Sequence, residues 1–152
     1  MKDAPPTINI AIIGVGNCAS SLVQGLTHYA GRNDASGLMH HSLGGYRPGD
    51  IRVVAAWDID ARKVGRDVAK AIFAPPNCTV VFASEVPDTG AVVRMGRILD
   101  GVAEHMADHP AERTFLPAGE PEPSREDVVA ALRDARVDVL MNYLPVGSQQ
   151  AT

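Results

Sequence analysis

The sequence predicts an α/β fold built on a parallel sheet, and two stretches of it carry this prediction. The apolar stretch Ile10–Ile13 runs directly into Gly14-Val15-Gly16 and then into a pattern of helical spacing. A second, β-branched stretch, Ile51–Trp57, ends in Asp58. A strand, a glycine turn, a helix and then a strand ending in an acid is the order typical of a dinucleotide-binding fold. We therefore expect a Rossmann-type doubly wound parallel sheet.

The glycine turn has the spacing Gly14-x-Gly16-x-x-Ala19. Gly14 permits a tight turn between strand and helix, Gly16 lets the backbone approach a pyrophosphate, and Ala19 lets the helix pack close to the sheet. The helix N-terminus would offer free N–H groups to phosphate oxygens. The pattern alone also fits an ordinary glycine turn of an α/β protein. The cofactor-binding residues expected here are Gly14, Val15, Gly16, Asn17, Cys18 and Ala19.

Asp58 is the expected ribose ligand. An acid at the end of the second strand accepts hydrogen bonds from the adenosine ribose and repels a 2′-phosphate, which favours NAD over NADP. The neighbouring Arg62 and Lys63 weaken this preference. Asp58 could also cap the next helix, and the two roles are compatible.

An insertion must lie between the first helix and the second strand. The acid usually follows the glycines by about 20 residues, and Gly16 and Asp58 are about twice as far apart. The segment His28–Asp50 fills this interval, rich in glycine and without sustained periodicity.

The remaining elements follow from periodicity and from turn residues. Ser124 and the acids after it form a capping start for the last helix. No internal repeat is present. The expected strands are Thr7–Ile13, Ile51–Trp57, Thr79–Ala83 and Val137–Tyr143, and the expected helices are Asn17–Tyr29, Ala61–Phe73, Val92–Met106 and one that opens at Ser124.

Several characteristic motifs follow one another along nearly the whole chain. They are Gly14–Gly25, Gly37–His40, Trp57–Asp60 with Lys63–Gly65, Leu99–Gly101 and Val137–Ser148. Together they resemble the actinobacterial and archaeal branch of the myo-inositol-1-phosphate synthase family. The proline-rich stretch Ala107–Glu122 has no family character.

The resemblance implies the NAD-binding portion of such an enzyme, with residues 1–152 as one Rossmann domain. In the family, NAD oxidises glucose 6-phosphate at C5, C6 attacks C1 in an intramolecular aldol step, and the NADH formed reduces the ketone to give inositol 1-phosphate. The resemblance also implies a homotetramer, an isomerase of inositol and phospholipid biosynthesis, and further cofactor contacts. Those contacts map to Asp67 and Ala135. Further cofactor contacts are expected at Leu144, Pro145 and Gly147, because the turn Leu144–Ser148 follows the last strand and ligands lie across the carboxyl ends of parallel strands.

No catalytic residue is expected within this chain. The resemblance places the acid–base and lysine residues, with the substrate-binding and tetramer-forming part, beyond Thr152. Lys2 lies in the N-terminal tail, and Lys63 and Lys70 fall on a helix expected to be solvated, so none is expected to stabilise an oxyanion. The chain alone is therefore expected to be inactive.

Composition restricts the other function classes. The net charge of −4, without a basic stripe, argues against nucleic acid or an anionic membrane as partner. No leader or membrane-length apolar run is visible, so the cytoplasm is the default location. Cys18 and Cys78 lack the paired spacing of a zinc or disulfide framework, and no metal is expected. An NAD(P)-dependent dehydrogenase domain and a binding-only nucleotide sensor remain as alternatives.

Overall fold

The protein contains one four-stranded parallel sheet, seen here in a computed structural model that describes residues 7–99, 102 and 104–144. The strands are β1 (Ile8–Ile13), β2 (Ile51–Asp58), β3 (Val93–Met95) and β4 (Val139–Asn142). Their order is β3-β2-β1-β4, so the first strand lies inside the sheet and the chain crosses over it to reach β4. This order is that of a Rossmann-type doubly wound sheet, as predicted.

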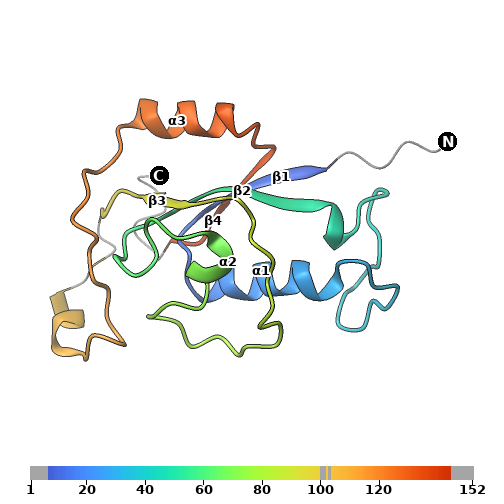
Figure 1. Cartoon of the computed structure of the whole chain (residues 1–152), viewed down its shortest axis with the longest axis horizontal. Helices are drawn as coiled ribbons and strands as arrows, with labels where there is room; N and C mark the ends of the chain where they lie inside the picture. The colour runs from blue at the N-terminus through green and yellow to red at the C-terminus, as the bar shows by residue number, and fades with distance from the viewer. Residues whose placement is uncertain (1–6, 100–101, 103, 145–152) are drawn as a thin grey trace.

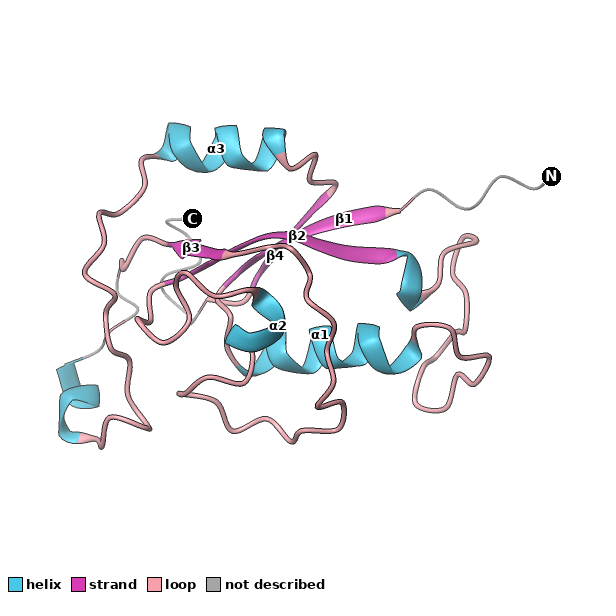
Figure 2. Ribbon diagram, in the orientation of Figure 1, coloured by secondary structure: helices cyan, strands magenta, loops and turns pink. Residues whose placement is uncertain are grey.

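Helices cover both faces of the sheet (Figure 1). Helix α1 (Asn17–Tyr29) and the short α2 (Val68–Ala71) lie on one face, and α3 (Arg125–Asp134) lies on the other. Two 3₁₀ turns, η1 (Pro48–Asp50) and η2 (Glu104–Asp108), lie in the connections, which form long loops (Figure 2). Each helix in the described part of the chain is too short or too polar to cross a lipid bilayer.

The two central strands, β1 and β2, bury side chains on both of their faces. Along β1, Ile10 and Ile12 pack toward α1 and α2, whereas Ala11 and Ile13 pack toward α3. This alternation follows from the two-residue period of a strand, and burial on both sides explains why β1 is apolar at every central position. On the α3 face the small side chains of Ala11 and Ala55 leave room for Trp57.

The predicted strands Thr7–Ile13 and Ile51–Trp57 and the predicted helix Asn17–Tyr29 are confirmed within one residue. Helix α3 begins after Ser124, whose hydroxyl accepts the Asp127 N–H at 3.1 Å, so the predicted cap is also confirmed. The last predicted strand is correct but shorter, spanning Val139–Asn142.

The predicted helix Ala61–Phe73 is wrong over its first half. Residues 61–65 form turns, and the helix covers only Val68–Ala71. Gly65 has a φ of +82° and its N–H donates to the Val93 carbonyl at 2.8 Å, so the chain here joins a neighbouring segment. Glycine adopts a positive φ at little cost, and a residue with a positive φ interrupts a helix.

Two further predicted elements are wrong. Residues 79–83 form no strand, because the buried Gln24 side chain accepts the Phe82 and Ala83 N–H groups that a sheet partner would have taken. In place of a helix over Val92–Met106, the structure has β3 and η2. The third strand of the sheet is therefore Val93–Met95.

The insertion predicted at His28–Asp50 is present, after the end of α1 and before β2. It consists of turns, a short Leu43–Tyr46 bridge and η1. Because it joins a helix C-terminus to the beginning of a strand, it lies at the sheet end opposite the carboxyl ends of the strands (Figure 1). The insertion therefore leaves the site described below untouched.

Candidate functional site

The glycine turn follows β1 and has the geometry that its sequence predicts. Gly14 has a φ of +89°, and its N–H donates to the Trp57 carbonyl at 2.9 Å. A Cβ at Gly14 would lie 3.1 Å from the Tyr143 carbonyl oxygen. Both the dihedral angle and the close approach of β4's end therefore require glycine.

Gly16 differs from Gly14, since it precedes α1 with a φ of −100° and a Cβ there would meet nothing within 4 Å. No side chain caps α1, and its first turn carries no acid. An uncapped helix N-terminus facing open space is an anion-binding arrangement, because its N–H groups and its dipole both favour negative charge.

The other four residues predicted in this turn differ in how much of each is exposed to solvent. Asn17 and Cys18 are exposed, whereas Val15 and Ala19 are fully buried. The side chains of Val15 and Ala19 are therefore not accessible to a ligand. Asn17 also holds the segment after α2, since its Oδ1 accepts the Cys78 N–H at 2.9 Å.

Asp58 ends β2 and is only 8% exposed. One carboxylate oxygen accepts the Val15 N–H at 2.7 Å, and the other accepts the N–H groups of Ile59 and Asp60 at 2.8 and 2.9 Å. Asp58 thus fixes the glycine turn and the bend after β2. It caps no helix, because no helix begins within these residues.

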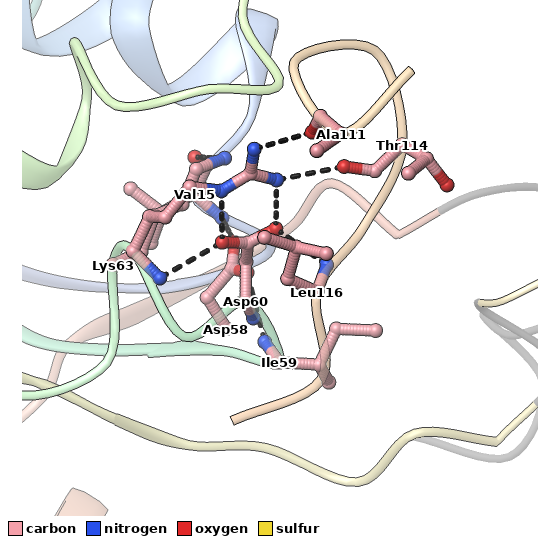
Figure 3. Close-up of polar contacts among 9 residues, drawn as sticks. Val15, Asp58, Ile59, Asp60, Lys63, Ala111, Thr114 and Leu116 are labelled. Carbon is pink, nitrogen blue, oxygen red and sulfur yellow. Dashed lines mark hydrogen bonds and ion pairs between the residues drawn. The ribbon is translucent and has the colours of Figure 1, made fainter. Parts of the chain in front are cut away.

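The expectation that Lys63 lies on a solvated helix is wrong. Its side chain is buried, 1% exposed, and Nζ donates to the Val15 carbonyl at 2.7 Å (Figure 3). Burial lowers the pKa of Lys63, and the nearby carboxylates of Asp58 and Asp60 oppose this shift. A lysine therefore lies directly beside the glycine turn.

Asp60 and Arg62 form an ion pair with a structural task. Asp60 is fully buried, and Arg62 donates to it from Nε at 2.8 Å and from Nη2 at 2.6 Å. Burial alone would raise the Asp60 pKa, but hydrogen bonds from Arg62 and from the Leu116 N–H outweigh it and hold that pKa below its usual value. Such bidentate pairing is the strong form of a charge-assisted hydrogen bond.

The pair anchors residues Ala111–Ala118, which we call the wall segment. Arg62 donates to the Ala111 carbonyl at 2.6 Å and to the Thr114 carbonyl at 2.7 Å (Figure 3 shows both acceptors). Asp60 accepts the Leu116 N–H at 3.0 Å, and the Ala61 N–H donates to the Leu116 carbonyl at 2.7 Å. An irregular stretch is thus held against the end of β2.

A cavity of about 1280 Å³ lies between the wall segment, α3 and the carboxyl ends of the strands. Ligands of open α/β sheets bind at these strand ends, where the strand order reverses. Much of the surface is apolar, and its charged side chains come from several segments, among them Asp58, Lys63, Arg97, Arg113 and Arg125. The lining includes Gly14, Gly16, Asn17, Trp57, Asp58, Lys63, Arg97, Arg113, Phe115, Arg125, Leu132, Tyr143 and Leu144.

The predicted residues do not all meet at this cavity. Asp67 caps α2 through the Ala69 N–H at 2.8 Å and also accepts the Thr89 and Gly90 N–H groups at 3.1 and 2.8 Å. Ala135 ends α3 and packs against the core of the α3 face. Neither lines the cavity. Pro145 and Gly147 lie outside the described residues, and cofactor contacts at all four stay predictions.

Sequence reasoning missed the roles of Lys63, Asp60 and Trp57. Two sequence features indicated these roles. Four charged residues are concentrated within Asp58–Lys63, and Gly65 interrupts the helical pattern that follows. The sole tryptophan lies buried against the glycine turn and lines the cavity.

No protein-family profile matches the chain. The chain is 46% identical over 152 residues to the inositol-3-phosphate synthase of Mycobacterium tuberculosis and 48% identical over 148 residues to that of Corynebacterium glutamicum. These matches cover 98% and 95% of this chain but 39% and 38% of the relatives. The chain therefore spans about two-fifths of the length of these curated relatives.

Two solved structures share the fold. The crystal structure of Ari2 aligns over 95% of this chain and 40% of its own, with a TM-score of 0.72 and 32% identity. A myo-inositol-1-phosphate synthase-related protein from Thermotoga maritima aligns over 91% of this chain and 34% of its own, with a TM-score of 0.59 and 19% identity, a likeness of fold. By its sequence, the chain is similar to inositol-3-phosphate synthases over about two-fifths of their length.

Proposed function

We propose that this chain binds NAD and forms the coenzyme-binding part of an inositol-3-phosphate synthase. The observation that carries the proposal is the uncapped N-terminus of α1 behind Gly16, at the carboxyl ends of four parallel strands. The pyrophosphate would lie over residues 14–19 and accept backbone N–H groups. The large, partly apolar cavity beside this turn has room for the two nucleosides.

Two side chains support NAD over NADP. Asp58 keeps its carboxylate at the cavity, where a ribose hydroxyl can donate to it and a 2′-phosphate would be repelled. Arg62, the cation that could have accepted a 2′-phosphate, directs its guanidinium to Asp60 and to two wall-segment carbonyls. A 2′-phosphate would have to break these bonds to pair with it.

The similarity to inositol-3-phosphate synthases extends the proposal to substrate and assembly. The coenzyme would take a hydride from glucose 6-phosphate and return it after ring closure, so that inositol 1-phosphate forms without net redox change. We further propose a cytoplasmic homotetramer for the complete enzyme. The cradle described here supplies the coenzyme, and the groups that move protons on the sugar belong to the rest of the enzyme.

Titration with NAD and NADP tests the proposal. Trp57 is the only tryptophan and lines the cavity, so its fluorescence should change on binding. We expect NAD to bind at least about tenfold more tightly than NADP, a difference of about 1.4 kcal/mol. Asp58→Asn should narrow the ratio of the two affinities, and the ratio is a better readout than NAD affinity alone because Asp58 also holds the turn. Equal affinities in the wild type would refute the assignment of Asp58, and an absence of binding would refute the proposed function.

A further inference from the structure

Lys63 is the buried cation of this site. Its Nζ reaches the middle of the glycine turn, and the Val15 carbonyl is the acceptor found for it within the described residues. An ammonium group has three N–H donors, and one carbonyl occupies a single one of them. Lys63 also borders the cavity, so its charge is close to whatever lies over the turn.

Lys63 and Asp58 together hold both backbone polar groups of Val15. Asp58 accepts the Val15 N–H at 2.7 Å, and Lys63 donates to the Val15 carbonyl at 2.7 Å. These contacts fix the two peptide planes between Gly14 and Gly16. The planes set the direction of the N–H groups at the start of α1, which a pyrophosphate would meet.

The buried charges around the turn balance one another, and a bound pyrophosphate would change that balance. Asp60 is neutralised by its ion pair with Arg62, which leaves Asp58 and Lys63 as the other two buried charges. A pyrophosphate would add two negative charges beside the Asp58 carboxylate. The charge of Lys63 and the α1 dipole are the features of this turn that offset them.

We propose that Lys63 is a positioning residue for the coenzyme pyrophosphate, holding the Val15 carbonyl and offsetting the phosphate charge. The inference rests on the proposed function. It goes beyond it in assigning the ligand's charge balance to one side chain. A lysine that only filled the core would support every part of the ligand equally, whereas a lysine acting on phosphate would support only the charged part.

The test compares two ligands on two variants. Lys63→Met keeps the length of the side chain and removes its charge and its donors, and Lys63→Gln keeps a donor for Val15 without the charge. Lys70→Met is the matched control, because Lys70 is exposed on the surface and, within the described residues, forms an ion pair with the exposed Asp88 at 3.6 Å. Calorimetry measures the affinity for ADP-ribose, and ligand-observed NMR measures the affinity for adenosine, which lacks phosphate. A thermal melt without ligand reports folding of each variant.

We expect Lys63→Met to weaken ADP-ribose at least tenfold and adenosine less than threefold, with Lys63→Gln between it and the wild type and Lys70→Met unchanged. Equal loss of both ligands, or unchanged ADP-ribose affinity in folded Lys63→Met, would overturn the inference while leaving the proposed function intact. Failure of both Lys63 variants to fold would also overturn it, since Lys63 would then be a core residue. If the wild type itself bound neither NAD nor ADP-ribose, the proposed function would fail first.

Discussion

Gly14 and Gly16 lie two residues apart, yet substitutions at the two positions should have different effects. A substitution at Gly14 should lower stability, and one at Gly16 should weaken coenzyme binding. Gly14 has a φ of +89° and is pressed against the Tyr143 carbonyl, whereas Gly16 has an ordinary φ of −100° and faces open space. An alanine at Gly14 therefore strains the fold. A side chain at Gly16 enters only the space where the pyrophosphate would lie.

The structure sets the expected sizes. Gly14→Ala should lower the free energy of unfolding by about 1–3 kcal/mol, the usual cost of a residue held in a sparsely populated backbone conformation, and its Cβ would need a shift of the Tyr143 backbone 3.1 Å away. For a chain of this size, each kcal/mol corresponds to a fall in Tm of about 2–4 °C. Gly16→Val should change stability by less than about 0.5 kcal/mol, as surface substitutions usually do, but it should weaken NAD at least about tenfold.

Circular dichroism melts measure the stability of each variant, and calorimetry measures NAD binding below the melting temperature. Gly16→Ala, whose side chain has one carbon in place of the three of valine, serves as an intermediate and should weaken NAD binding less than Gly16→Val. The reasoning would be refuted if folded Gly16→Val bound NAD as well as the wild type. It would also be refuted if Gly14→Ala were as stable as the wild type.

Three further outcomes are expected. Arg62→Met should lower the free energy of unfolding by about 3 kcal/mol, because it leaves the fully buried Asp60 charge without its partner, and should expose the wall segment to limited proteolysis; an undigested segment would contradict this. Asp67→Asn keeps an oxygen that can cap α2 but removes the charge and puts an amide donor in place of one carboxylate oxygen, so that the Ala69 or the Gly90 N–H loses its acceptor; it should destabilise the protein by about 1–2 kcal/mol at neutral pH. Burial would raise the Asp67 pKa, but hydrogen bonds from Ala69, Thr89 and Gly90 hold it below the usual value, so this stabilisation exists above the unfolded-state pKa and is lost as pH falls through the folded one. Urea melts from pH 6 downward should therefore converge for wild type and Asp67→Asn, and parallel curves would argue against the assignment. Finally, mass spectrometry should find no inositol 1-phosphate when the chain alone is given NAD and glucose 6-phosphate; turnover comparable to a full-length relative would show that the catalytic groups are misassigned.

Local signals predicted the part of the site that local chemistry builds. The apolar run of β1, the glycine turn and the start of α1 are contiguous in sequence, so periodicity and turn residues were sufficient. Asp58 was also predicted at a strand end facing the turn. Its contact with the Val15 N–H agrees with that position.

Long-range contacts decided the rest. Residues 61–67 are expected in a helix, but the Gly65 N–H donates to the Val93 carbonyl and the helix begins only at Val68, whose N–H donates to the Ala91 carbonyl; no local pattern reveals these pairings. Lys63 was assigned to a solvated surface because a helix was expected there. Once the segment turns instead, the same side chain reaches the Val15 carbonyl 48 residues earlier. The wrongly predicted helix thus caused the wrong placement of Lys63.

The wall segment bears on the thermodynamics of ligand binding. Its order comes from the Asp60–Arg62 pair and from backbone contacts to residues 59–61, all of which are contacts within the chain itself. A surface already ordered loses no conformational entropy when a ligand arrives. The heat capacity change of NAD binding should then reflect only the apolar surface that the ligand covers, and a much larger negative value would reveal additional ordering on binding. The ion pair thus completes during folding an arrangement that other proteins complete only when their ligand binds.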